Sequence, residues 1–244
     1  MKISIIGLGW FGLALAQELQ KKHSISGTTR TIEKLKKIQE LVPDIFLLHD
    51  GEKPNPALFH ADTVLINIPP TKNQLDWLKT WEVPLEKHII FISSTSVYGQ
   101  QQIDVNEETC PLPDSESGKI LIEEEQWIKT FPFYTIIRFG GLIGPDRHPG
   151  RHLSGKLNLT GGNWPVNLIH QKDTVFFTQH VIEKKLVGEV FNLVHPYHPT
   201  RKDYYQHYCK MNNLILPQFV EDIEKGKKVS SLKVEKIYQF KESI

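Results

Sequence analysis

The 244-residue sequence has little cysteine, no strong excess of either charge and no long apolar run. Its two cysteines, Cys110 and Cys209, lie far apart and make no metal-ligand pair, so we expect no metal site and a reducing, cytoplasmic location. A formal net charge of +1 and the lack of a nucleic-acid-binding motif exclude nucleic acid and membrane surfaces as expected partners. No stretch approaches the length of a membrane span. A small-molecule substrate is the expected partner, and a homodimer is left open.

The residues that are present alternate between short apolar runs and helical patterns. Helices are expected over 10–22, after a cap at Thr31, around QLDWLKTWE and over 120–131. Most of the expected strands are apolar throughout, so both faces of their sheet must be covered. This predicts an α/β fold with a doubly wound parallel sheet (Rossmann) and a small C-terminal α/β lobe. The expected strands are 2–7, 23–29, 45–49, 63–70, 88–94 and 134–141.

The texture of the chain changes after Gly140. The following stretch is rich in glycine, histidine and arginine, which is typical of loops over a site, and 189–195 resembles one more strand. The tail from Pro196 onward is helical and aromatic. We therefore expect a Rossmann domain over 1–145 to which 165–195 returns, and a small substrate-side lobe from 146–164 and 196–244.

The segment GLGWFG is a Gly-x-Gly-x-x-Gly motif that follows a strand and opens a helix. The first glycine permits a tight turn, the second lets a pyrophosphate approach the backbone, and the third lets helix and strand pack closely. A secretory signal is the competing interpretation of the apolar N-terminus, but it has no use for glycines at this spacing. A glycine turn without a ligand is the other alternative. The expected cofactor-binding residues here are Gly7, Gly9, Trp10, Phe11 and Gly12.

The end of the second strand indicates which dinucleotide binds. An NAD site places a carboxylate about 20 residues after the first glycine, but this chain has Thr28, Thr29 and Arg30 there and no acid before Glu33. Two hydroxyls and a guanidinium suit a 2′-phosphate, so NADP(H) is predicted over NAD(H). Alternatively, Arg30 only solvates a helix start. Two further cofactor contacts are expected at the end of the fourth strand, at Ile68 and Pro69.

Four segments in order carry a resemblance to a known family: GLGWFG, SSTSVYG, the helix with Lys119, and RFGGLIGP. Together they resemble the extended short-chain dehydrogenase/reductase family of NAD(P)-dependent epimerase/dehydratase proteins. TTR after the second strand and SESGK in place of the tyrosine motif resemble its atypical YeeZ-like branch. The resemblance implies that Ser94 orients a substrate oxygen, with Thr95 beside it, and that Lys119 holds the nicotinamide ribose in a catalytic role.

The sequence departs from this family at the proton donor. The resemblance places the family's catalytic tyrosine at Ser115, and an aliphatic hydroxyl is a far weaker acid than a phenol. We interpret Ser115 as a helix N-cap, with Glu116 in the first turn. Lys119 then either holds the ribose or is an ordinary surface lysine.

Another group must move the proton if catalysis survives this change. His148, His152 and His170 are candidates by residue type, because imidazole as a group titrates near neutral pH, but none has a supporting motif. Tyr98 belongs to a turn whose tyrosine the family uses structurally. Arg147 and Arg151 are expected to bind an anionic part of a substrate. The sequence thus predicts an NADP(H)-preferring oxidoreductase or epimerase/dehydratase-like enzyme for a small sugar-like or anionic carbonyl/hydroxyl compound. The alternative is an inactive NADP(H)-binding sensor or regulatory protein.

Overall fold

The computed structural model describes residues 1–221 and 225–244, which form two compact units. The first unit comprises 1–94, 116–138 and 174–191, and the second comprises 95–115, 139–173 and 192–244.

The first unit is built on a seven-stranded sheet in the order β10-β7-β5-β4-β1-β2-β3. Neighbouring strands from β3 to β5 pair in parallel. The strand order reverses between β1 and β4, the position at which open α/β sheets bind ligands. The doubly wound fold predicted from the sequence is confirmed. The strands are β1 (Lys2–Ile6), β2 (Ser24–Thr29), β3 (Asp44–Leu47), β4 (Thr63–Ile66), β5 (His88–Ser94), β7 (Tyr134–Phe139) and β10 (Glu189–Leu193).

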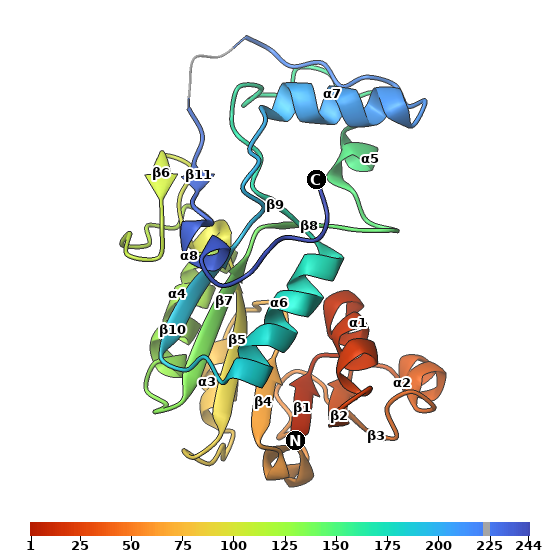
Figure 1. Cartoon of the computed structure of the whole chain (residues 1–244), viewed down its shortest axis with the longest axis vertical. Helices are drawn as coiled ribbons and strands as arrows, with labels where there is room; N and C mark the ends of the chain where they lie inside the picture. The colour runs from red at the N-terminus through yellow and green to blue at the C-terminus, as the bar shows by residue number, and fades with distance from the viewer. Residues whose placement is uncertain (222–224) are drawn as a thin grey trace. The chain divides into compact units, whose positions relative to one another are not determined.

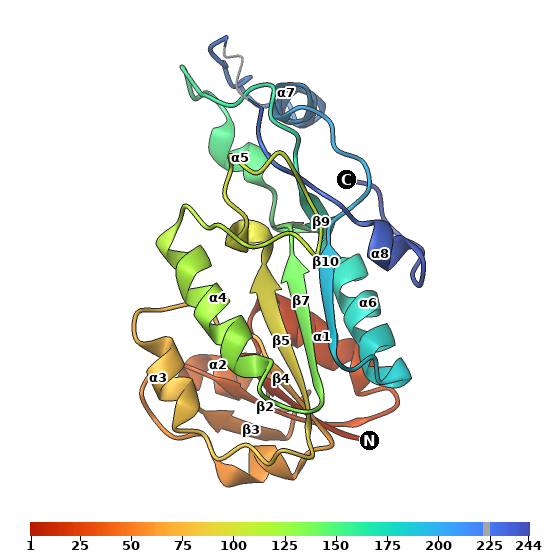
Figure 2. The same cartoon turned by 90° about the vertical axis from the view of Figure 1, so that its left-hand side faces the viewer.

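Helices cover both faces of this sheet (Figures 1 and 2). α3 and α4 lie on one face, while α1 and α6 lie on the other, where Lys22 after α1 donates a hydrogen bond to Glu183 of α6 at 3.2 Å. Because both faces are covered, the central strands are buried along their length, as all-apolar strands require. The helices are α1 (Trp10–Leu19), α2 (Ile32–Ile38), α3 (Gln74–Lys79), α4 (Glu116–Ile128) and α6 (Gln171–Lys184), with the short 3-10 helix η1 (Pro56–His60) before β4.

Some boundaries differ from the sequence prediction. The apolar pattern predicted a helix over 120–131, whereas α4 begins at Glu116, directly after the N-cap predicted at Ser115, so Lys119 lies within its first turns. α6 was not predicted. The stretch after Gly140, expected as loops, contains the short strand β8 (Gly141–Ile143) and the short helix α5 (Pro149–Leu153).

The second unit consists of short elements. β8 pairs in parallel with β9 (Leu168–His170), and β6 (Asp104–Val105) pairs in parallel with β11 (Lys228–Val229). α5 packs against α7 (Arg201–Met211), as Figure 1 shows. A small core of Ile143, Val166, Leu168 and Tyr205 joins β8, β9 and α7. The second unit also contains the 3-10 helix η2 (Thr95–Val97) and the helix α8 (Leu232–Glu235). In the described residues, no helix combines the length and the hydropathy that crossing a bilayer demands.

Candidate nucleotide-binding and catalytic site

The glycine turn after β1 has two packed glycines and one open one. Gly7 has φ +103°, and a Cβ there would lie 2.2 Å from the carbonyl oxygen of Asn67. A Cβ at Gly12 would lie 2.3 Å from the carbonyl oxygen of Gly7, so both positions exclude a side chain. A Cβ at Gly9 would meet nothing within 4 Å. The middle glycine therefore presents its backbone to open space at the start of α1, where a pyrophosphate would approach.

Side chains from β2 and the end of β4 hold this turn in place. The Asn67 side-chain amide donates to the Gly7 carbonyl at 3.0 Å, and the Gly7 N–H donates to the Thr28 hydroxyl oxygen at 3.0 Å. Leu8 N–H donates to the Thr28 carbonyl at 2.8 Å. Thr28, predicted as a phosphate contact, thus supports the glycine turn. Asn67 was not singled out from the sequence, since one asparagine before a proline pair carries no specific signal.

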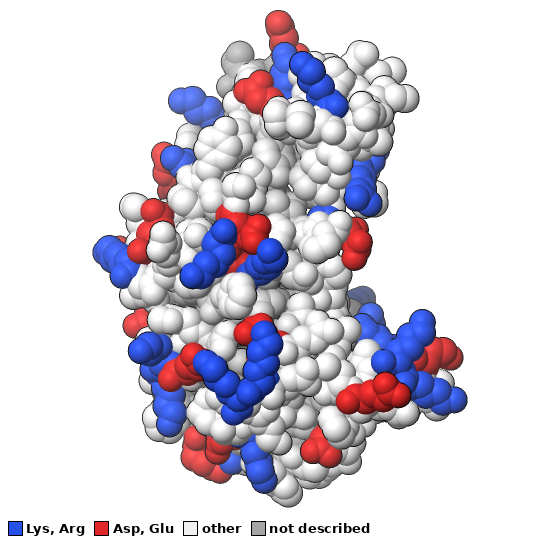
Figure 3. Space-filling model, turned by 45° about the vertical axis from the view of Figure 1, so that its right-hand side comes forward, with Lys and Arg blue, Asp and Glu red and all other residues white. Residues whose placement is uncertain are grey.

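Two cations lie close together after β2. Arg30 is exposed, whereas Thr29 beside it is buried. Thr31 caps α2, as predicted, and its hydroxyl accepts from the Lys34 N–H at 3.3 Å. Burial lowers the pKa of Lys34, and the nearby Arg30 lowers it further. Sequence reasoning missed Lys34 because a lysine in a charged helix resembles ordinary surface. On the face drawn in Figure 3, acidic and basic side chains are otherwise interspersed.

A buried ion pair contacts the end of β5. Arg138 of β7 binds Glu125 of α4 through Nε at 2.9 Å and Nη2 at 2.6 Å, and both side chains are almost fully buried. The Ser93 hydroxyl donates to the same carboxylate at 2.7 Å. Three elements are thereby tied together immediately before Ser94, the partly buried last residue of β5. Thr95 follows it in η2 and is buried.

The loop over 147–152, which carries Arg147, His148, Arg151 and His152, makes contacts within the second unit. His148 stacks on Tyr208 with a ring distance of 3.5 Å, and its Nδ1 accepts from the Gly150 N–H at 3.1 Å. Its Nε2 therefore carries the proton and donates to the Tyr204 hydroxyl at 3.0 Å. Burial lowers the pKa of His148 to about 4, with a smaller effect from Arg151. These contacts make His148 a packing residue.

The other residues of this loop have different surroundings. Arg151 Nε donates to the Tyr208 hydroxyl at 3.2 Å, so this predicted substrate contact already has a partner. Arg147 and His152 are exposed. The His170 ring accepts from the Lys172 N–H at 3.2 Å, as a side chain near a helix start often does.

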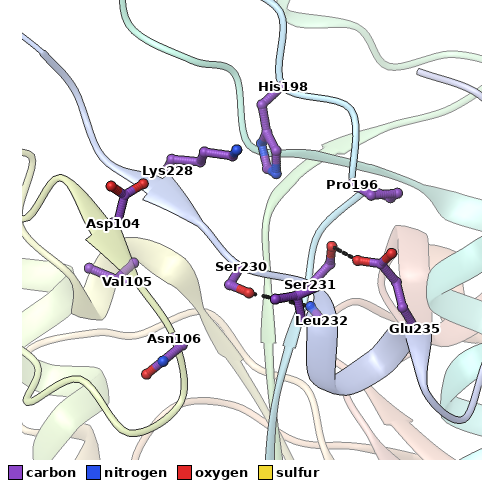
Figure 4. A pocket seen from close by; sticks show the side chains of 10 residues that line it. All are labelled: Asp104, Val105, Asn106, Pro196, His198, Lys228, Ser230, Ser231, Leu232 and Glu235. Atoms are coloured by element: carbon purple, nitrogen blue, oxygen red, sulfur yellow. Dashed lines mark hydrogen bonds between the residues drawn. The ribbon is translucent and has the colours of Figure 1, made fainter.

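An open pocket of about 460 Å³ also lies in the second unit (Figure 4). Lys228 and His198 approach each other on one side of it, while Glu235 bonds Ser231 on the other. Acidic, basic and hydroxyl side chains all line this pocket, so the residue types of its lining do not indicate one class of ligand.

Comparison with known proteins places the chain in a family. It is 31% identical to Protein YeeZ of Escherichia coli K12, over 93% of this chain and 89% of that protein. The chain therefore belongs to the family of Protein YeeZ. The family model "NADP oxidoreductase coenzyme F420-dependent" also matches residues 2–96.

Solved structures share the fold of this YeeZ-like protein. UDP-glucuronic acid 4-epimerase from Bacillus cereus, solved in complex with NAD, superposes with a TM-score of 0.77 at 22% identity, covering 100% of this chain and 94% of that one. dTDP-glucose 4,6-dehydratase from Bacillus anthracis, also in complex with NAD, gives a TM-score of 0.74 at 17% identity, with 97% and 89% covered.

The lysine and serine of the altered tyrosine motif lie at the start of α4. Ser115 directly precedes the helix, at the N-cap position, and Glu116 lies in the first turn. The Lys119 ammonium is 3.8 Å from the Glu116 carboxylate, and its side chain is 60% exposed. An exposed ion pair of this kind contributes little to stability. Lys119 is therefore available to a bound molecule in this YeeZ-like protein, although no phenol precedes it.

Proposed function

We propose that this protein is an NADP(H)-dependent oxidoreductase or epimerase/dehydratase-like enzyme for a small carbonyl or hydroxyl compound, sugar-like or anionic. The observation that carries the proposal is the glycine turn, in which Gly7 and Gly12 are filled by packing and Gly9 alone is open. A structural turn has no need of an open glycine, whereas a pyrophosphate needs that backbone surface.

The preference for NADP(H) rests on the charge at the end of β2. Arg30 and Lys34 provide two neighbouring cations for a 2′-phosphate. A carboxylate that would bond a ribose 2′-hydroxyl is missing from 24–32. The adjoining loop residues Ile68 and Pro69 would pack on the cofactor next to the glycine turn.

In the proposed enzyme, a few residues have separate roles in binding and orienting the substrate and the cofactor. The bound nicotinamide supplies or accepts a hydride. Ser94 orients the substrate oxygen from the end of β5, where Ser93 and the Glu125–Arg138 pair fix the backbone before it. Lys119 holds the nicotinamide ribose. Arg147 and Arg151 attract an anionic group of the substrate.

Titration with NADPH and with NADH, for wild type and the Arg30→Ala variant, tests the cofactor assignment. Wild type is expected to bind NADPH more tightly, and Arg30→Ala should weaken NADPH binding by about tenfold to a hundredfold because a charge-assisted hydrogen bond is lost. Lys34→Ala should show a smaller loss of the same kind, and Lys37→Ala, on the same helix, serves as the matched control. Equal affinity of wild type for both coenzymes would contradict the assignment.

A second candidate function is that of an inactive NADP(H)-binding sensor or regulatory protein. The serine at position 115 favours it, because the acid of the family is missing there. A screen of NADPH oxidation with small aldehydes, ketones and keto sugars separates the two functions. Turnover that is lost in Ser94→Ala supports the enzyme, and NADPH binding without any turnover supports the sensor.

A further inference from the structure

The open pocket of Figure 4 is built entirely from residues of the second unit. Its volume of about 460 Å³ is within the range of small-molecule sites. The residue types of its lining do not choose a ligand, but the placement of the charged groups does. Lys228 and His198 lie on one side of the pocket, and Glu235 lies on the other. The two signs of charge are therefore separated across it.

The Lys228 ammonium faces the pocket without a counterion. In the described part of the chain it has no hydrogen-bond or ion-pair partner. Asp104 is its register neighbour on β6, yet these two described residues form no ion pair. The strand that carries the lysine is fixed, because the Val229 N–H donates to the Asn167 side chain at 2.8 Å. An anionic group that enters the pocket would meet a cation on a well-held strand.

His198 lies next to this ammonium, and its tautomer is fixed. Its Nδ1 is 2.8 Å from the Val166 carbonyl oxygen, which can only accept, so Nδ1 carries a hydrogen. Burial lowers the pKa of His198, and the hydrogen bond to Val166 opposes this shift. Lys228 and His195 lower the pKa further, while Glu235 raises it. A carboxylate bound at Lys228 would offset the effect of the lysine and favour a second hydrogen bond, donated by Nε2 of the protonated ring.

The opposite side of the pocket carries an acid without a cation. The Glu235 carboxylate accepts from the Ser231 hydroxyl at 2.6 Å, and no cationic side chain of the described residues pairs with it. Glu235 and Lys228 also do not pair with each other, so a gap separates their charged groups. A molecule that carries both an anionic and a cationic group can bridge this gap.

Apolar side chains complete the lining of the pocket. Leu232 is 66% exposed although it is a large apolar residue, and Pro196 and Val105 line the same space. Glu235 would repel a ligand that is only anionic, and Lys228 would repel one that is only cationic. A ligand with both charges and an apolar part fits all of these surroundings.

We propose that this pocket binds a small zwitterion of the amino-acid type with an apolar side chain. The ligand carboxylate accepts hydrogen bonds from Lys228 and from His198. Its ammonium group donates to Glu235, and its apolar part packs on Leu232. The site is additional to the dinucleotide site at the glycine turn, and its occupation does not depend on the proposed chemistry.

Calorimetric titration with L-leucine and with the dipeptide leucyl-leucine, whose charges lie farther apart, tests this site. N-acetyl-L-leucine lacks the cation and L-leucinamide lacks the anion, so these two compounds are matched control ligands. Lys228→Met and Glu235→Gln each remove one charge from the pocket. Lys236→Met and Glu108→Gln are control variants at exposed positions that do not line it. The thermal midpoint of each variant shows whether it is folded.

We expect saturable binding of at least one zwitterion, weakened about tenfold or more in Lys228→Met and in Glu235→Gln and unchanged in both control variants. The two control ligands should bind about tenfold more weakly or less. The imidazole NMR signal of His198 should titrate at a higher pH when the zwitterion is bound.

No saturable binding of either zwitterion up to about 10 mM would overturn the proposal. Equal affinity for N-acetyl-L-leucine and L-leucine would also overturn it, because the pocket would then bind anions without using Glu235. No coenzyme is present in these titrations, so either result leaves the proposed NADP(H)-dependent function unaffected.

Discussion

The carboxyl group of Glu124 in α4 is buried, and the described residues offer it no hydrogen-bond partner. Its residue is 0% exposed. Burial raises its pKa to about 8, and Glu123 adds to the shift. Because the folded-state pKa lies above the unfolded value, the protonated acid stabilises the fold at low pH, and this stability is lost as the pH rises from about 4.5 through 8.

We expect Glu124→Gln to raise the free energy of unfolding at pH 9 by about 1–3 kcal/mol, because an amide carries no charge to desolvate. At pH 5 the variant and wild type should differ little. Urea unfolding at both pH values measures this, and Glu40→Gln, at an exposed position away from Glu124, is the control. Parallel pH dependence of wild type and Glu124→Gln would show that Glu124 does not titrate as described.

At the scale of elements, the Glu125–Arg138 pair joins α4 to β7, and Ser93 extends it to β5. Breaking a buried pair by removing one partner leaves an uncompensated charge, so Glu125→Ala should lower the free energy of unfolding by about 3–5 kcal/mol. The double variant Glu125→Leu, Arg138→Met should recover most of this loss, since no charge remains buried. Chemical denaturation measures both, with Glu123→Ala as the exposed control. A double variant no more stable than Glu125→Ala would contradict a charge-based explanation.

The elements also show which sequence signals suffice. The central strands were predictable because burial on both faces requires an apolar run. The glycine turn was predictable because its close contacts require residues without a Cβ. α6 was missed because its run TVFFTQHVI is rich in β-branched and aromatic residues, which favour strands. The start of α4 at Glu116 agrees with the N-cap predicted at Ser115, whereas the apolar pattern of 120–131 marks only the later part of the helix.

At the scale of the whole molecule, the site depends on contacts between residues far apart in the chain. Asn67 reaches Gly7 across 60 positions of the chain. No local pattern marks this residue, because a single asparagine has many uses on a protein surface. The cofactor motif was therefore predictable from sequence, while the side chain that supports it required the fold.

Cofactor binding should also stabilise the whole molecule, and two glycines of the turn allow this effect to be separated from folding. Gly9→Ala places a methyl group in open space at φ −76°, so its stability without ligand should lie within about 0.5 kcal/mol of wild type. Gly12→Ala forces a methyl group against the Gly7 carbonyl and should cost about 1–3 kcal/mol.

Thermal unfolding with NADPH at 100 times its Kd should stabilise wild type by about 2.7 kcal/mol. Gly9→Ala should lose this gain, because its methyl group occupies the space through which the pyrophosphate meets the backbone. A Gly9→Ala variant that is stabilised by NADPH as strongly as wild type would place the dinucleotide elsewhere. It would also remove the basis for a role of Ser94 or Lys119 in hydride chemistry, since each is assigned relative to a cofactor bound at this turn.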